Sequence, residues 1–156
     1  MGHYTVFVFM TTDKNYLIIF GSLTGNARRV AELIQQKLDA KLFNSKDFDS
    51  LDQIITLNHN SFEIVFVAST WGDGELQSDM ENLLINSTIL KSPAVCHIVE
   101  LGNYYGYDDF EFGALMHIKR CTKHLGFYPG KQLSLDSMPR MDWDTLSSWI
   151  VELRSI

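Results

Sequence analysis

The sequence predicts a doubly wound α/β domain, with a five-stranded parallel sheet and helices on both of its faces. Two apolar runs carry this prediction, YLIIF at residues 16–20 and FEIVFVA at 62–68. Both have the length of a strand and lack a consistently polar face, which is typical of strands buried on both sides. Longer segments with helical spacing follow them. Right-handed β-α-β crossovers place such helices over both faces of a parallel sheet.

The other elements follow from local patterns. At residues 26–38 apolar side chains recur at steps of three and four, which predicts a helix. The remaining predicted helices cover residues 48–55, 80–90, 110–125 and 143–153. The remaining predicted strands cover residues 41–43, 94–101 and 132–135. We expect Gly126 to end the third of these helices and Asp142 to cap the last.

Length and composition fit one domain at residues 16–156, preceded by an extension at 1–15 to which we assign no role. No apolar run reaches the roughly 18–20 residues of a membrane span. The short apolar start lacks the marks of a signal peptide, so we expect a cytoplasmic protein. We expect the two cysteines, Cys96 and Cys121, to be reduced core thiols because no CxxC spacing occurs.

The acidic surplus is concentrated in one stretch. The net charge is −6, and residues 71–118 hold eight carboxylates but one basic side chain, Lys91. The rest of the chain is nearly neutral. This distribution argues against a nucleic-acid partner and favours a basic protein partner attracted over long range. A surface that only confers solubility is the alternative.

In doubly wound sheets, ligands bind beyond the carboxyl ends of the strands, where the strand order reverses. The first predicted strand is followed by GSLTGNA at residues 21–27 and then by a helix. Free N–H groups at the helix start and the hydroxyls of Ser22 and Thr24 favour a phosphate, and Gly25 allows close approach. The loop lacks the lysine of a P-loop. Simple helix capping is the alternative.

The next two loops at this edge are aromatic. The segment STWGDGEL at residues 69–76 places Trp71 at the end of a buried strand, where its ring can lie flat on a planar ligand. The segment GNYYGYDD at 102–109 holds three tyrosines. Together with the first loop, they indicate a ligand with a planar ring and a phosphate tail. For either aromatic loop alone, a protein interface is an equal alternative.

These three motifs, in this order, resemble those of flavodoxins and of the FMN domains of diflavin reductases. The resemblance extends from residue 16 to the C-terminus and implies the flavodoxin-like fold, with strand order 2-1-3-4-5. The few residues between Lys131 and Trp143 leave no room for the insertion of long-chain flavodoxins, so the chain resembles the short-chain class. Asn103 stands where many flavodoxins have aspartate.

The resemblance also implies an FMN site, residue by residue. The phosphate would be held by Ser22, Thr24, Gly25, Asn26 and Ala27. The isoalloxazine ring would lie between Trp71 and Tyr107. The carbonyl of Gly72 would turn toward flavin N5 on one-electron reduction. Ring heteroatoms would bond the backbone of Asp73, Gly102, Asn103 and Asp108. The predicted site also includes Leu23, Ser69, Thr70, Gly74, Leu101, Tyr104 and Phe110.

The implied function is low-potential one-electron transfer by non-covalent FMN, mainly between semiquinone and hydroquinone, without independent substrate turnover. A flavin-containing NAD(P)H reductase or a ferredoxin reductase would donate electrons to a stand-alone monomer. Iron–sulfur or radical enzymes would accept them. We expect no catalytic or metal site, because the histidines lack ligand spacing, and no nucleic-acid or membrane partner. A two-electron FMN reductase of the same fold and a flavodoxin-like regulatory module are the alternatives.

Overall fold

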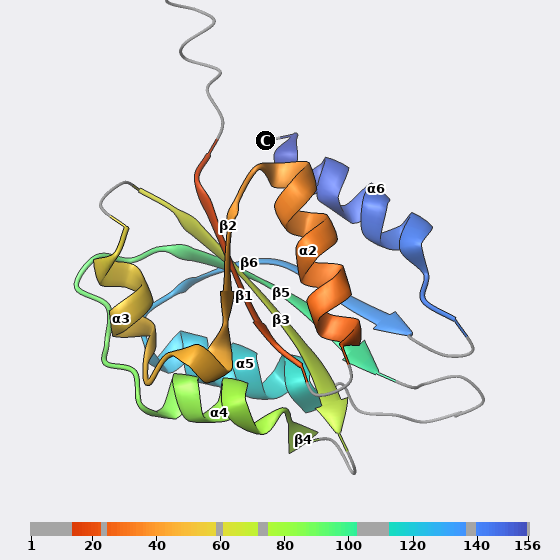
Figure 1. Ribbon diagram of the computed structural model, residues 1–156. Helices are drawn as coiled ribbons and strands as arrows, with labels where there is room; N and C mark the ends of the chain where they lie inside the picture. Colours follow the sequence, from red (N-terminus) through yellow and green to blue (C-terminus); the bar gives the residue numbers. More distant parts are fainter. Residues whose placement is uncertain are drawn as a thin grey trace, which may run out of the picture.

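The computed structural model describes residues 14–22, 25–58, 61–71, 75–102, 113–136 and 140–155, with Trp71 described by its backbone. Most of the proposed extension at 1–15 lies outside these ranges. The strands are β1 (Tyr16–Gly21), β2 (Lys41–Asn44), β3 (Glu63–Trp71), β4 (Glu75–Leu76), β5 (Val95–Gly102) and β6 (Tyr128–Asp136). The parallel order β2-β1-β3-β5-β6 confirms the predicted topology (Figure 1). The two-residue β4, which pairs antiparallel with the end of β3, was not predicted.

The helices lie in two layers, one on each face of the sheet (Figure 1). The first layer consists of α2 (Asn26–Leu38) and α6 (Trp143–Arg154). The second consists of α3 (Leu51–Thr56), α4 (Ser78–Ile85) and α5 (Gly113–His124), and the short 3-10 helix η1 (Ser45–Asp47) precedes α3. The predicted bounds of α2 are confirmed, and α6 extends one residue beyond its predicted end.

Alternating side chains of the central strands build two hydrophobic cores. Ile18 and Val65 point into the core under α2 and α6, whereas Ile19 and Phe66 point into the core over α4 and α5. All four side chains are fully buried. This two-sided burial explains why the strands are apolar at consecutive positions rather than at alternate ones.

The helix predicted at 80–90 ends at Ile85, because the residues beyond it bond to α3 instead. The Ser87 hydroxyl accepts the Leu51 N–H at 2.8 Å, and the Thr88 hydroxyl donates to the Asp52 carboxylate at 2.6 Å. The prediction for α3 was also displaced, since it begins at Leu51 rather than at residue 48.

The strand predicted at 132–135 is longer, because β6 already begins at Tyr128. Pro129 and Gly130 are of types that are uncommon inside strands, yet β6 is an edge strand, where proline is tolerated. A Cβ on Gly130 would lie 2.6 Å from the Cys96 carbonyl oxygen and would also strike the His97 ring. Glycine at this position therefore lets β6 approach β5 closely.

The two capping residues predicted for the last two helices are confirmed, although α5 ends at His124, one residue earlier than predicted. Gly126 follows α5 with a φ of +94°, and the Phe127 N–H donates back to the Thr122 carbonyl at 3.0 Å, which closes a Schellman motif. The Asp142 carboxylate accepts the Thr145 N–H at 3.1 Å and so caps α6. These hydrogen bonds from Thr145 also lower the pKa of Asp142.

Both cysteines are free thiols, as predicted. Cys96 is buried in β5, and Cys121 on α5 is partly buried and packs against the core over α4 and α5. Burial raises the pKa of both thiols, and the nearby Glu81 adds to the effect at Cys121. A raised pKa reduces the thiolate fraction, which makes both side chains poor nucleophiles.

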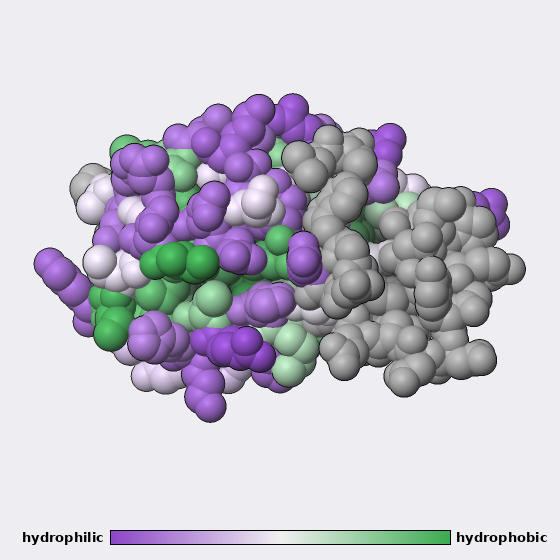
Figure 2. Space-filling view, turned by 90° about the horizontal axis from the view of Figure 1, so that it is seen from below, coloured by the Kyte–Doolittle hydropathy of each residue, from purple (hydrophilic) through white to green (hydrophobic). Residues whose placement is uncertain are grey.

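The face that carries α4 and α5 shows apolar side chains set among polar ones (Figure 2). The exposed large hydrophobic residues of these helices include Ile85 on α4 and Met116 on α5.

Within the described ranges, no helix combines the length and apolarity needed to cross a bilayer.

A buried histidine lies near the amino ends of the strands. The Nδ1 atom of His97 accepts the Lys131 N–H at 2.9 Å, so the neutral ring carries its proton on Nε2, which lies 2.6 Å from Glu63 Oε1. Glu63 also pairs with Lys14 at 3.2 Å. Burial lowers the pKa of His97, although Glu63 opposes that shift.

We expect acid to destabilise the fold through this histidine. Because its pKa in the folded state lies below its ordinary value of 6.5, the unfolded chain binds more protons in the window below that value. The free energy of unfolding should therefore fall as the pH drops from 6.5 to the lowered pKa. His97→Asn retains an acceptor for the Lys131 N–H but cannot titrate. Thermal melts across this window should show a smaller loss for His97→Asn than for the wild type.

The exposed His124, replaced by asparagine, is the matched control and should keep the wild-type pH dependence. If His97→Asn loses stability with acid as steeply as the wild type, another group is responsible.

Candidate cofactor-binding site

Three strands end side by side at one edge of the sheet. β3 lies between β1 and β5, with Gly21 opposite Ala68 and Ser69 opposite Leu101. After β1 the chain moves outward to β2 and then returns to β3 on the other side. The carboxyl edge between β1 and β3 is therefore a topological switch point, where ligands of doubly wound folds bind.

The loop after β1 is arranged for an anion. The Ser22 hydroxyl oxygen accepts the Gly25 N–H at 2.9 Å, which leaves its own proton available to donate. Gly25 has a φ of +92°, and α2 begins at the next residue with no acidic side chain in its first turn. The first N–H groups of a helix lack intrahelical acceptors, and the helix dipole is positive there. This part of the site therefore favours a negatively charged group.

The space beside this loop is open. A Cβ built on Gly25 would meet no heavy atom of the described residues within 4 Å. Of the two arginines that follow, Arg28 lies over the Phe20 ring, 5.3 Å from its centroid, and Arg29 donates to the Asn26 side chain. The described donors of the loop itself, the Ser22 hydroxyl and the backbone N–H groups at the start of α2, are neutral, which suits a terminal phosphate.

Gly21 and Gln77 fix the start of this loop. Gln77 is 1% exposed, and its side-chain oxygen caps α4 by accepting the Met80 N–H at 3.0 Å. A Cβ on Gly21 would strike that oxygen and would lie 3.1 Å from both the Met80 Cβ and the Ser45 Oγ. The close approach of α4 to the end of β1 therefore requires glycine at residue 21.

The ends of β3 and β5 are joined through a buried glutamate. Glu100 is 0% exposed and accepts a hydrogen bond from the Thr70 hydroxyl. That hydroxyl oxygen in turn accepts the Ala114 N–H at 2.9 Å, at the start of α5. Glu100 was counted in the acidic surplus of the surface, and that assignment was wrong because the side chain lies inside. Its position at the end of an apolar run was the only signal in the sequence.

The structure gathers the described part of the predicted site at this edge. The described residues are Ser22, Gly25, Asn26, Ala27, Ser69, Thr70, Leu101 and Gly102, together with the Trp71 backbone. The side chains of Ala27 and Leu101 are buried in the core under α2 and α6, so only their backbone could meet a ligand. The other predicted residues lie outside the described ranges: Leu23, Thr24, Gly72, Asp73, Gly74, Asn103, Tyr104, Tyr107, Asp108 and Phe110.

The sequence model of the flavodoxin family matches residues 18–114, which include all three of these loops. The chain belongs to the flavodoxin family. Flavodoxins are FMN-binding electron carriers, so FMN is the cofactor that this membership assigns to the site. The neutral donors and open space at the start of α2 fit its phosphate.

Solved flavodoxins share this fold. The Streptococcus pneumonia TIGR4 flavodoxin is 22% identical with a TM-score of 0.69, covering 89% of this chain and 97% of that one. A mutant of flavodoxin from Pseudomonas aeruginosa is 22% identical with a TM-score of 0.65, covering 89% and 95%. Fusobacterium nucleatum flavodoxin bound to flavin mononucleotide is 16% identical with a TM-score of 0.64, covering 90% and 96%. No curated protein matches the sequence.

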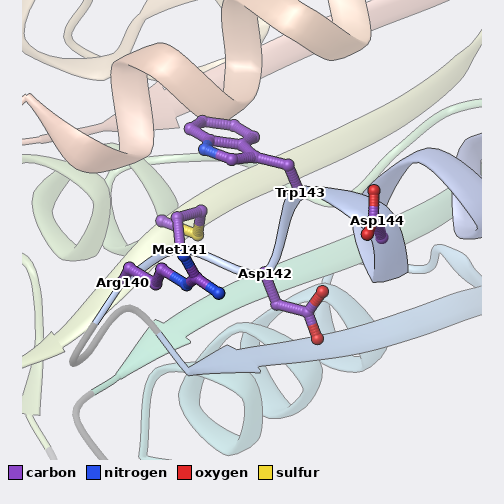
Figure 3. A pocket seen from close by; sticks show the side chains of 5 residues that line it. All are labelled: Arg140, Met141, Asp142, Trp143 and Asp144. Atoms are coloured by element: carbon purple, nitrogen blue, oxygen red, sulfur yellow. The ribbon is translucent and has the colours of Figure 1, made fainter.

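A separate cavity of about 580 Å³ lies farther along the same edge, between β6 and α6. Arg140, Met141, Asp142, Trp143 and Asp144 line it. In Figure 3 the Trp143 ring points toward α2, whereas the carboxylates of Asp142 and Asp144 point away from that ring. Because β5 lies between β6 and β3, the cavity is set apart from the switch point, and we assign it no part in this flavodoxin's cofactor site.

We expect Gly21→Ala to destabilise the protein by displacing the Gln77 cap, since losing an N-cap costs about 1 kcal/mol. Gln77→Ala should cost a similar amount. The double variant should be less destabilised than the sum of the two, because removing the Gln77 side chain makes room for the new Cβ. Urea unfolding of the four proteins in this cycle measures the coupling, and strictly additive free energies would contradict the contact.

Proposed function

We propose that this flavodoxin is a low-potential, one-electron carrier that binds one FMN non-covalently and does not turn over a substrate by itself. The phosphate would lie on the loop after β1, and the ring would lie between the loops that follow β3 and β5. The Ser22–Gly25 turn at the start of α2 carries this proposal, because it presents neutral donors at the switch point of the sheet.

The proposed ring contacts are those that the sequence predicts, with Trp71 on one face and Tyr107 on the other. The Gly72 carbonyl would accept a hydrogen bond from N5 of the one-electron reduced flavin, which favours the semiquinone. Nearby carboxylates would disfavour the anionic hydroquinone, by about 1 kcal/mol for each unit charge near the protein surface. Together these two effects separate the one-electron steps and give a strongly reducing second step.

We also propose the class of redox partner from the charge of this region. Glu75 on β4, which pairs with Trp71 at the end of β3, is exposed, and Asp79 and Glu81 in the first turn of α4 are partly exposed. A basic surface near the flavin of a reductase or an iron–sulfur enzyme would be attracted to these carboxylates over long range. A flavin-containing NAD(P)H reductase or a ferredoxin reductase is the proposed donor, and iron–sulfur or radical enzymes are the proposed acceptors.

Anaerobic reduction with dithionite tests the carrier function. We expect a yellow protein that passes through a blue neutral semiquinone, releases FMN on denaturation and does not oxidise NAD(P)H by itself. Direct bleaching without an intermediate, or rapid NAD(P)H turnover, would favour a two-electron reductase. A colourless protein that fails to bind added FMN would favour a regulatory module of the same fold.

Ser22→Ala should weaken FMN binding by about tenfold, because hydrogen bonds to charged groups are among the stronger ones. Riboflavin has the same ring but no phosphate, so its affinity should change far less. Fluorescence titrations with both flavins separate the two effects. Ser148→Ala, on the exposed side of α6, is the matched control and should bind both flavins as the wild type does. Equal losses for FMN and riboflavin would contradict a phosphate contact at Ser22.

A further inference from the structure

Two apolar rows of side chains end in polar residues at the carboxyl edge. In β3 the row facing α4 and α5 consists of Ile64, Phe66 and Ala68, and the next side chain on that face is Thr70. In β5 the row of Cys96 and Ile98 is followed by Glu100. Thr70 and Glu100 therefore stand on the same face of adjacent strands, at the point where the apolar core meets the cofactor edge.

Burying a carboxyl group this completely costs free energy. Removing an ionised group from water costs several kcal/mol unless hydrogen bonds compensate. Glu100 is 0% exposed, and the Thr70 hydroxyl donates to it. The Ala114 N–H, which has no intrahelical acceptor so near the start of α5, donates to the Thr70 oxygen at 2.9 Å. Apolar side chains could fill the same space, so packing alone does not account for these residue types.

This hydrogen-bond chain crosses three elements at the bases of two loops. Thr70 lies at the start of the second predicted loop, residues 69–76, and directly precedes Trp71, at which β3 ends. Glu100 lies two residues before Gly102, where the third loop begins, and Ala114 stands in the helix that follows that loop. Hydrogen bonds are directional and narrow in distance, whereas apolar contacts tolerate sliding. The chain can thus fix how far apart the two loops start.

We propose that Thr70 and Glu100 are positioning residues, whose hydrogen-bond chain to Ala114 sets the spacing between the two loops that hold the planar ring of the cofactor. They act through the loops and not through the phosphate. That the ring is the isoalloxazine of FMN rests on the proposed function. The hydrogen-bond chain itself belongs to the protein and does not depend on the cofactor.

Thr70→Val removes the hydroxyl but keeps the branched shape, and Thr70→Ser keeps the hydroxyl. We expect Thr70→Val to weaken FMN and riboflavin by the same factor, about tenfold, because binding tolerates little displacement of positioned groups. Thr70→Ser should restore most of the affinity for both flavins. This equal loss is the opposite of the pattern expected for Ser22→Ala, which acts on the phosphate.

A second measurement does not need the cofactor. In the apoprotein, hydrogen exchange of the Ala114 amide followed by NMR should be about tenfold faster in Thr70→Val than in the wild type, and near wild type in Thr70→Ser. Exchange of the Val99 amide, in the interior of β5, serves as the internal reference for global opening. Faster exchange at Ala114 without a change at Val99 would support the hydrogen-bond chain.

The outcomes separate the two proposals. If the wild type binds neither flavin, the proposed function fails and Ala114 exchange still tests the hydrogen-bond chain. If Thr70→Val speeds Ala114 exchange but leaves both affinities unchanged, the chain exists and the positioning role is overturned. A loss for FMN without a loss for riboflavin would overturn it as well. If Thr70→Ser does not restore the flavin affinities, the shape of residue 70 matters rather than its hydroxyl, and this result also contradicts the proposal.

Discussion

Burial of β1, β3 and β5 on both faces is the constraint on which the rest of the structure depends. Side chains such as Ile18, Ile19 and Phe66 are fully buried, so these strands cannot carry polar groups along most of their length. Polar chemistry is therefore confined to the strand ends. Because the strands are parallel, their carboxyl ends lie together, and the loops that follow them share one edge. The cofactor site of this flavodoxin is a consequence of how its core is made.

The sequence predicted correctly those helices and strands whose apolar residues repeat at a single spacing and whose ends are marked by nearby residues. The helix α2 was predicted to the residue because its apolar positions all fall on one face. The strand β6 was predicted too short, because the acceptability of Pro129 and Gly130 depends on an edge position and on the neighbouring His97 ring. The end of α4 depends on the hydrogen bond that Ser87 accepts from Leu51 of α3 and the one that Thr88 donates to Asp52, and no local pattern contains these contacts.

In the site, too, local features could be predicted, whereas contacts between distant segments could not. The Ser22–Gly25 turn could be predicted because all its parts lie within a few residues of one helix start. The link between Thr70 and Glu100 could not, since it depends on the register between two strands that are 30 residues apart at these positions. In the sequence, Glu100 is one carboxylate among several in an acidic stretch. Only the register shows that it turns inward while Glu75 remains exposed.

Besides the Cys96 thiol, β5 carries two buried ionisable side chains, one nearer each end, and these two are stabilised in different ways. His97, near the amino end, can become neutral by losing its proton, and its Nδ1 then accepts the Lys131 N–H. Because burial lowers its pKa, we expect this side chain to make the fold sensitive to acid at a distance from the cofactor edge. Glu100, near the carboxyl end, accepts a hydrogen bond from the Thr70 hydroxyl, whose oxygen accepts the Ala114 N–H. Both groups lie at the bases of the two loops that we propose hold the flavin ring. In the positioning role proposed above, disturbing this hydrogen-bond chain alters the spacing of those loops, so the consequence is local. The two predictions thus assign the control of stability to one end of the strand and the placement of the ring to the other.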